Sequence, residues 1–341
     1  MTIVKTVPAA ILSASKLAAG ALNYYVSGRT PPSAYQSMVS LFCVTGGVSN
    51  DAMSQLVSLA YPPYDLPDAK GVVGDLRPDN LERITSEIDA NGFHVFEQRL
   101  PESLCDSLLA FATSAPCVQR GMGGAGVDEV VSRYPRGQPS AVRYDFRAQD
   151  VINNPAVQSV MADHAIIAVA QSYLRCKPVI DVMSMWWHTD FSKQPDKDAA
   201  QFWHFDMDRI KWLKFFIYLT DVGPDNGPHS FVQGSHRSGG IPRSLLAKGY
   251  SRLTDAEVAA QYSTDRIIEF VAPRGTVIAE DTRGLHKGKH LAGGDRLMLQ
   301  LQFSNSLFGG YYPPSRIGNA SDPGLGEMIR QYPHIYSNYI K

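Results

Sequence analysis

Hydrophobic positions in the first half of the chain recur at the spacing of an α-helix. Between residues 77 and 92, Leu81, Ile84 and Ile88 stand three or four positions apart, and Gly92 follows where a glycine commonly ends a helix. The first hundred residues are therefore expected to be mainly helical, and further helices are expected up to residue 174. The predicted helices cover residues 49–61, 77–92, 101–115 and 155–174.

After residue 178 the pattern changes to short runs that are rich in β-branched and aromatic residues and bounded by turn residues. A cluster of turn residues at 223–230 separates two of these runs, and the only helix-length segment between the runs is at residues 253–262. This arrangement favours an antiparallel barrel or jelly roll over alternating βαβ units. The predicted strands cover residues 93–100, 179–191, 211–222, 265–273, 275–282 and 296–307.

The composition narrows the class of protein. The 341 residues are enough for one large domain or two modest ones, and 44% hydrophobic and 19% charged residues are an ordinary globular balance. The net charge of −1 gives no basic field, so we expect no nucleic-acid partner. No apolar run reaches the roughly 20 residues that span a bilayer. The four cysteines form no Cys-x-x-Cys pair and are interpreted as reduced thiols, which predicts a cytoplasmic protein.

Two segments resemble known signals without matching them fully. The N-terminal run after Lys5 looks like a signal peptide, but Lys16 interrupts it, so we expect a packed amphipathic helix instead. Gly121, Gly123 and Gly126 have the spacing of a dinucleotide-binding loop. That loop needs a strand before it and an amphipathic helix after it, and neither flank fits. We therefore expect a mobile glycine-rich loop here, with a lid over a pocket as the alternative.

The first candidate for chemistry is the pair His204 and Asp206, two positions apart in the segment QFWHFDMD. Residues i and i+2 of a strand face the same side, so a His-x-Asp can direct an imidazole and a carboxylate at one divalent metal ion. The same pattern occurs a second time, at His188 and Asp190. A third ligand is therefore needed to identify the site.

The downstream sequence offers a third ligand and a cation. His286 and His290 are followed by Arg296 at the start of an apolar strand, where alternation places Arg296 on the same face as Met298 and Gln300. Two histidines and one carboxylate occupy one face of an octahedral metal and leave the other open, as in non-haem iron(II) oxygenases. A dicarboxylic cosubstrate at the open face needs a cation for its distal carboxylate, and a bidentate arginine suits that.

Other histidines compete with this set. His188 is followed by a polar stretch rather than a strand, and His290 lies in a loop-like context. His229 and His236 belong to a segment of turns around a short strand, where a histidine more often bonds the backbone than a metal.

The motifs occur in the order of a longer pattern. It comprises Trp-His-x-Asp, an apolar strand ending in Tyr-Leu-Thr-Asp-Val, Asn-Gly-Pro leading into Gly-Ser-His, and Asp-Thr-x-Gly-x-His with a following arginine. This pattern resembles the phytanoyl-CoA dioxygenase family of iron(II)/2-oxoglutarate-dependent oxygenases, most strongly over residues 201–303. The resemblance implies a mainly β fold with flanking helices, in which a double-stranded β-helix (jelly-roll, cupin-like) core follows a helical N-terminal region. We accordingly expect a helical extension at 1–77 and an oxygenase domain at 78–341.

The resemblance also implies the site and the reaction. His204, Asp206 and His286 would ligate iron(II), Arg296 would bind 2-oxoglutarate, and O₂ would be the oxidant. The expected outcome is hydroxylation of an unactivated C–H bond of a small-molecule substrate with release of succinate and CO₂. Desaturation, ring formation and epimerisation are the alternatives within the same chemistry.

Two further cations are candidates for cofactor binding. Lys214 shares strand parity with Phe216 and Tyr218, so it either extends outward to solvent or meets an anionic group of the cosubstrate or substrate. Arg143 is the other cation that could face the pocket. The competing interpretation of the whole pattern is a non-catalytic β-barrel that binds a small ligand or a metal, although such a module has no need of a cosubstrate arginine.

Overall fold

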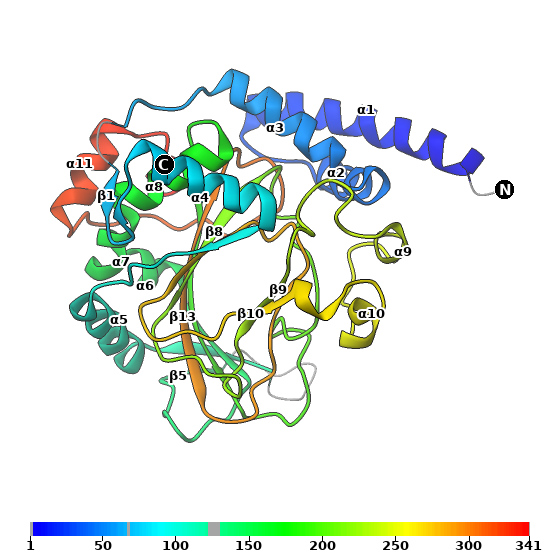
Figure 1. The fold of residues 1–341 in the computed structure, drawn as a ribbon. Helices are drawn as coiled ribbons and strands as arrows, with labels where there is room; N and C mark the ends of the chain where they lie inside the picture. Colours follow the sequence, from blue (N-terminus) through cyan, green and yellow to red (C-terminus); the bar gives the residue numbers. More distant parts are fainter. Residues whose placement is uncertain (1–2, 67–68, 122–129, 341) are drawn as a thin grey trace.

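The structure is a computed structural model that describes residues 3–66, 69–121 and 130–340 (Figure 1). Its centre is a set of antiparallel strands, and every strand pair in the described residues runs antiparallel. The strands are β1 (Lys70–Gly71), β2 (Gly74–Asp75), β3 (Phe93–Val95), β4 (Cys117–Arg120), β5 (Val131–Ser132), β6 (Arg143–Phe146), β7 (Val179–Thr189), β8 (Trp212–Tyr218), β9 (His229–Val232), β10 (Ile267–Glu269), β11 (Val277–Glu280), β12 (His286–Gly288) and β13 (Asp295–Ser304).

Two sheets face one another and form the double-stranded β-helix. The larger sheet has the order β3-β11-β8-β13-β7-β6-β4-β5, and the smaller has the order β10-β9-β12. Aromatic and aliphatic side chains of both sheets, such as Phe216 on β8, Phe231 on β9 and Met298 on β13, pack into one buried cluster. The expected fold class is therefore confirmed.

Alternation along β13 separates the core from the cavity. Leu297, Leu299 and Leu301 join the large hydrophobic cluster between the sheet and the helices. Arg296 and Met298 face the other way and line a cavity between the two sheets. The strand parity expected from the sequence is confirmed, and it places a guanidinium inside the barrel.

Helices cover the outer face of the larger sheet, where α4, α5, α7, α8 and α11 contribute to the large cluster (Figure 1). Gly92 ends α4 with φ 95°, a left-handed conformation that favours glycine, as the sequence predicted. The helices are α1 (Ile3–Ser27), α2 (Pro32–Thr45), α3 (Val48–Ala60), α4 (Pro78–Asn91), α5 (Glu102–Ser114), α6 (Ala148–Ile152), α7 (Pro155–Met161), α8 (His164–Leu174), α9 (Arg243–Leu246), α10 (Asp255–Ala259) and α11 (Pro323–Gln331).

The single helix predicted for residues 155–174 is wrong, because the chain forms α7 and α8 with a break at Asp163. The Asp163 carboxylate accepts hydrogen bonds from the backbone N–H of Ile166 at 2.9 Å and of Val72 at 2.7 Å. A carboxylate that caps one helix and binds a distant loop stabilises a helix start at this position.

The three N-terminal helices lie at one end of the barrel (Figure 1). Helix α1 packs against α2 so closely that a Cβ at Gly20 would lie 2.1 Å from the Cβ of Ala34. Its opposite side is open, since Leu22 is 72% and Val26 is 87% exposed, so the expected amphipathic helix is packed along one side only. Hydrogen bonds such as the one from Asn50 to the Ile210 carbonyl (3.0 Å) join this region to the barrel.

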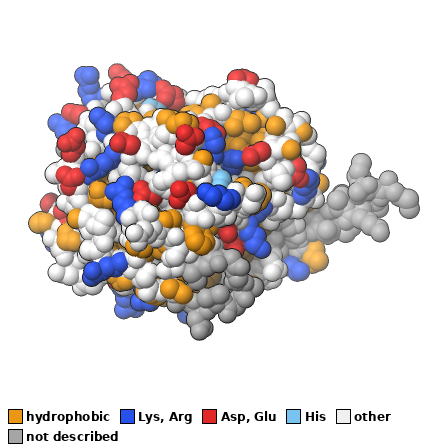
Figure 2. All heavy atoms as spheres, turned by 90° about the horizontal axis from the view of Figure 1, so that it is seen from below, with side chains coloured by type: hydrophobic (Ala, Val, Ile, Leu, Met, Phe, Trp, Pro, Cys, Tyr) orange, Lys and Arg blue, Asp and Glu red, His pale blue; other side chains and the backbone are white. Residues whose placement is uncertain are grey.

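Several expectations on organisation stay predictions. The division at residue 77 and a cytoplasmic location are among them. Gly123 and Gly126 of the glycine-rich loop lie outside the described residues. Among the described residues, no helix combines the length and hydropathy needed to cross a bilayer. Basic and acidic side chains are intermixed on the face shown in Figure 2, in keeping with the net charge of −1.

A buried ion pair joins β7 to the segment after the His-x-Asp motif. Arg209 meets Asp181 at 2.6 and 2.7 Å, and Gln302 and Ser304 of β13 each donate to the same carboxylate at 3.0 Å. Asp181→Ala would leave a buried guanidinium without its partner, so we expect a loss of about 3–5 kcal/mol in the free energy of unfolding, measured with urea. As a control, the exposed Asp79→Ala removes only a charge from the first turn of α4 and should lower stability by at most about 1 kcal/mol. Equal effects of the two substitutions would contradict the role given to the pair.

Candidate metal centre and cosubstrate pocket

A cavity of about 320 Å³ lies between the two sheets, and most of its lining is polar side chains on strands of both sheets and on the segment before β8. Its walls contain the residues that the sequence singled out together with others that it did not. The charged and imidazole side chains of the lining are Arg143, His188, Asp198, His204, Asp206, Asp208, Lys214, His229, Arg252, His286 and Arg296.

His204 and His286 are brought together by backbone pairing. The backbone N–H of His204 donates to the His286 carbonyl at 3.0 Å, and the reverse bond is 2.8 Å. This pairing places the two rings side by side, with centroids 4.3 Å apart. The Asp206 carboxylate lies 3.4 Å from Nε2 of His286 and 3.8 Å from Nε2 of His204. One ligand atom from each residue falls within 4.8 Å of the others, so the three could hold a metal ion.

The hydrogen bonds of the two rings select the tautomer that a metal requires. Nδ1 of His204 lies 2.8 Å from the Phe202 carbonyl, and Nδ1 of His286 lies 2.9 Å from the Gly284 carbonyl. A carbonyl only accepts, so each Nδ1 carries a proton, and in the neutral form of each ring Nε2 offers its lone pair to the cavity. Burial, together with the neighbouring His286, lowers the pKa of His204 well below its ordinary value and keeps that ring neutral.

Lys214 does not extend outward, so that alternative is wrong. The side chain is buried, and its ammonium lies 2.6 Å from Asp206 and 3.2 Å from Asp208. Burial opposes ionisation of Asp206, but Lys214 together with His286 and His204 outweighs it and holds the pKa of this carboxyl well below its ordinary value. Lys214 therefore helps to keep Asp206 as a charged carboxylate, and a direct contact between Lys214 and a cosubstrate stays a prediction.

Arg296 is buried without a carboxylate partner among the described residues. Its guanidinium donates to the Gly227 carbonyl and, at 2.7 Å, to Nδ1 of His188, while its Nε has no partner. Burial lowers the pKa of Arg296 to about 10, which expresses the cost of a cation that no anion compensates. The cavity thus contains a fork of N–H donors that suits a carboxylate.

The sequence makes His188 a competing metal ligand, but in the structure its ring accepts a hydrogen bond from Arg296. An arginine cannot accept a hydrogen bond, so Nδ1 of His188 is the acceptor and its Nε2 carries the proton. That Nε2 is buried, and it makes no hydrogen bond of normal geometry to another described residue. Burial and the Arg296 charge lower the pKa of His188 well below its ordinary value, so the ring is neutral. Arg296 and His188 therefore each present an unused N–H in the same cavity lining.

The sequence interpretation also missed a buried pair beside the triad. Nε2 of His229 lies 2.9 Å from Glu280, and the His229 ring centroid is 5.7 Å from that of His286. Burial raises the pKa of Glu280 to about 8, so this carboxyl holds its proton at neutral pH. The expectation that the His229 side chain bonds the backbone is wrong, because its Nε2 contacts the side chain of Glu280 on β11.

The remaining candidates lie farther from these contacts. Arg143 stacks 4.5 Å from the centre of the Trp186 ring and bonds Asp145 at 2.6 Å, and it lines both the cavity and an adjoining hollow of about 630 Å³. His290 is not among the three residues that converge; its Nδ1 lies 3.5 Å from Gln201.

Comparison with known proteins identifies the family. The family described as phytanoyl-CoA dioxygenase (PhyH) matches residues 88–296, more than half of the chain, and this range contains all three converging ligands and Arg296. The chain belongs to the PhyH family. It is accordingly a 2-oxoglutarate-dependent non-haem iron oxygenase by family, and His204, Asp206 and His286 are the candidate facial triad.

Individual relatives of this PhyH-family chain are distant. Ectoine dioxygenase of Stutzerimonas stutzeri (strain A1501) is 28% identical over 133 residues, which span 35% of this chain and 40% of the relative. The epimerase SnoN from nogalamycin biosynthesis, solved with Fe³⁺, α-ketoglutarate and nogalamycin RO, is 16% identical with a TM-score of 0.47, over 72% of this chain and 94% of SnoN. HygX from Streptomyces hygroscopicus, solved with nickel and 2-oxoglutarate, is also 16% identical with a TM-score of 0.47, over 67% and 89% of the two chains.

Proposed function

We propose that the protein uses iron(II), 2-oxoglutarate and O₂ to hydroxylate an unactivated C–H bond of a small-molecule metabolite, releasing succinate and CO₂. The observation that carries the proposal is the position of Arg296, a buried cation to which the described residues offer no carboxylate, in the same cavity as His204, Asp206 and His286. A barrel that only bound a metal would gain nothing from this costly arginine. The arrangement therefore favours an enzyme over a non-catalytic binding module.

The donor set of the triad fits iron(II). Two imidazole nitrogens and one carboxylate leave the remaining coordination positions open for a cosubstrate and O₂. Iron bound by His204, Asp206 and His286 would supply the redox chemistry of O₂ activation and C–H cleavage. The protein's own contribution is to fix the ligands: the backbone carbonyls of Phe202 and Gly284 orient the rings, and Lys214 helps to keep Asp206 ionised.

The unused donors fit the other end of 2-oxoglutarate. In our proposal, the distal carboxylate lies against Arg296 and accepts additional N–H donation from His188, which would satisfy both unpartnered groups. Trp186, Phe216 and Met298 line the same cavity and would exclude water from the reacting groups. Arg143, which bonds Asp145 near the adjoining hollow, is less suited to the distal carboxylate than Arg296 is.

Replacing His188 by leucine tests its proposed part in cosubstrate binding. We expect the 2-oxoglutarate concentration for half-maximal succinate formation to rise about tenfold, because a hydrogen bond to a charged group contributes roughly 1.5–3 kcal/mol. Iron affinity should stay close to that of the wild type, which separates this role from metal ligation. The control is His290→Leu, at a histidine outside the triad. A loss of iron binding in His188→Leu would instead support the rejected His188-x-Asp190 metal site.

Exchanging the metal tests the proposed reaction. Succinate formation should cease after chelation and return with iron(II) and ascorbate. Zinc should bind the same ligands, since it stands above iron in the affinity order, but it has no redox chemistry and should inhibit. Full turnover of the zinc form would contradict the proposed function. A screen of candidate metabolites for stimulated succinate release would then identify the substrate.

A further inference from the structure

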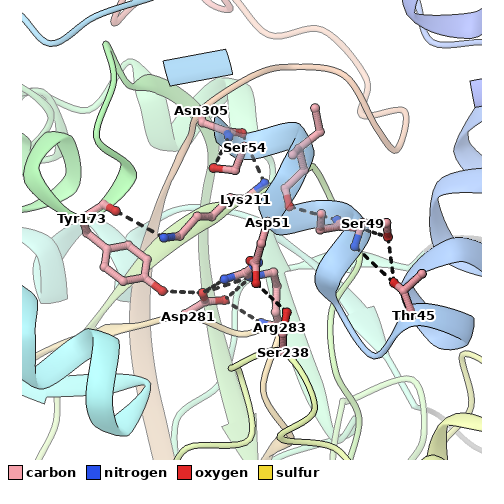
Figure 3. A network of polar contacts seen from close by, with 12 residues as sticks. Thr45, Ser49, Asp51, Ser54, Tyr173, Lys211, Ser238, Asp281, Arg283 and Asn305 are labelled. Atoms are coloured by element: carbon pink, nitrogen blue, oxygen red, sulfur yellow. Dashed lines mark hydrogen bonds and ion pairs between the residues drawn. The ribbon is translucent and has the colours of Figure 1, made fainter. Parts of the chain in front are cut away.

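A second cavity, of about 380 Å³, lies outside the barrel interior and shares no residue with the first. It is bounded by helix α3, the end of α8, the residue before β8 and the segments after β9 and before β12 (Figure 3). Four basic side chains line it, Arg175, Lys211, Arg237 and Arg283, against two carboxylates, Asp51 and Asp89. Its lining therefore carries an excess of positive charge.

Each carboxylate of this region already has a basic partner. Asp51 pairs with Arg283 at 2.9 Å, and Asp89 pairs with Arg175 at 3.1 Å. Behind the lining, Asp281 pairs with Arg283 at 2.7 Å and accepts a 2.6 Å hydrogen bond from the Tyr173 hydroxyl (Figure 3). The excess charge consequently belongs to the two remaining cations.

Lys211 is the more buried of these two. Its ammonium donates to the Tyr173 carbonyl at 3.3 Å and lies 3.9 Å from the centre of the Tyr173 ring, and the described residues offer it no carboxylate at ion-pair distance. One long hydrogen bond leaves most of the capacity of an ammonium unused. Burial and the neighbouring Arg283 lower the pKa of Lys211 to about 8, and the more distant carboxylates Asp281, Asp89 and Asp51 offset only part of this shift.

His236 and Arg237 add further unused donors. His236 is 5% exposed, and its Nδ1 is buried without a hydrogen-bond partner among the described residues. Burial lowers the pKa of His236 to about 4, so the ring is neutral and carries one N–H. The Arg237 side chain makes no ion pair in the part of the chain that the structure describes. The buried imidazole of His236 and the partly buried Lys211 therefore form an incomplete polar network, which is costly unless another group completes it, whereas Arg237 is an exposed cation of the same lining.

We propose that this cavity is a second ligand site, which binds a small oxyanion, a carboxylate or a phosphate, against Lys211, His236 and Arg237. An oxyanion supplies several acceptor lone pairs and a negative charge, which is what these groups lack. Arg283 is held by two aspartates and forms the floor of the site. The proposal is independent of the oxygenase reaction, because none of these residues lies in the triad cavity.

Isothermal titration of the full chain with inorganic phosphate and, separately, with succinate tests the site, at constant ionic strength maintained with chloride. The succinate titration uses Arg296→Leu protein, so that binding in the triad cavity does not contribute. We expect saturable binding of at least one of the two anions. The anion that binds more tightly, phosphate or succinate, indicates whether the natural ligand carries a phosphate or a carboxylate. Lys211→Met should weaken that binding about tenfold or more, because it removes the charge and keeps the length of the side chain. Lys16→Met, the same change at an exposed lysine of α1, should leave it unchanged.

A crystal structure of the wild type grown with the same anion gives a readout that does not depend on variants folding. Density for the anion within hydrogen-bond distance of Lys211 is expected. Absence of saturable binding for both anions would overturn the proposal. Binding that Lys211→Met does not weaken, or density at another place only, would also overturn it.

Discussion

Asp206→Ala is expected to abolish succinate formation and to weaken iron(II) binding more than about 100-fold, because losing even an outer partner of a metal ligand costs about 10–100-fold. Asp206 is the only acidic member of the triad, and its oxygens lie 3.4 and 3.8 Å from the two imidazole nitrogens. Its removal also leaves Lys214 buried with Asp208 as its remaining carboxylate partner. Binding should be measured by titrating iron(II) under anaerobic conditions, and turnover by succinate release.

Asp208→Ala is the matched control for this substitution. Asp208 stands two positions further along, lines the same cavity and also meets Lys214, at 3.2 Å, but it is not one of the three residues that converge. Asp208→Ala should retain an iron affinity within a few-fold of the wild type. Comparing the two variants therefore separates the loss of a metal ligand from the loss of a negative charge in the cavity. If both variants lost iron equally, the assignment of Asp206 as the carboxylate ligand would be wrong.

The sequence predicted those parts of the fold that local patterns encode. The alternation of Leu297, Leu299 and Leu301 assigned the inner and outer faces of β13 correctly. The strand predicted at 93–100 is shorter, since β3 covers Phe93–Val95. The strand order of the eight-stranded sheet could not be predicted in this way. β3 pairs with β11 almost two hundred residues later, and local periodicity does not identify a pairing partner at that distance. The missed break at Asp163 did have a signal, a helix-capping residue within an apolar stretch.

Some residues of the candidate site could likewise be predicted from local patterns, and others could not. His204 and Asp206 were found because strand parity alone places their side chains together, and His286 because of its motif. The partnership of His188 with Arg296 depends on the register of β7 against β13, where the two residues are directly opposite. The register of two strands cannot be determined from a single sequence. The second His-x-Asp, at His188 and Asp190, therefore resembled a competing metal site.

The sequence carries a weaker signal for the His229–Glu280 pair. A glutamate at the end of the apolar run Val277–Glu280 is costly to bury unless it is protonated or paired. A histidine at a similar depth on a facing strand is the natural partner, but only the structure brings His229 within 2.9 Å of it.

Arg296→Leu is expected to raise the 2-oxoglutarate concentration for half-maximal succinate formation by at least about 100-fold, because two charge-assisted hydrogen bonds at roughly 1.5–3 kcal/mol each would be lost. Iron binding should persist, since Arg296 bonds His188 and Gly227 and touches none of the triad. The cosubstrate-free variant should also unfold at a similar or higher temperature. In the wild type, the pKa of Arg296 is lowered to about 10 in the folded state, so the unfolded chain binds the guanidinium proton more tightly. The charged arginine therefore opposes folding at neutral pH, and leucine removes that cost.

The comparison with Arg143→Leu decides which cation serves the cosubstrate. Arg143 lines the same cavity but is partly exposed and already bonded to Asp145 at 2.6 Å, so its loss should change the 2-oxoglutarate requirement by less than about tenfold. If Arg143→Leu gave the larger rise, the distal carboxylate would lie near the adjoining hollow rather than beside β13. If Arg296→Leu bound 2-oxoglutarate as tightly as the wild type, the buried guanidinium would be a structural group. The buried arginine would then no longer favour an enzyme over a non-catalytic binding module.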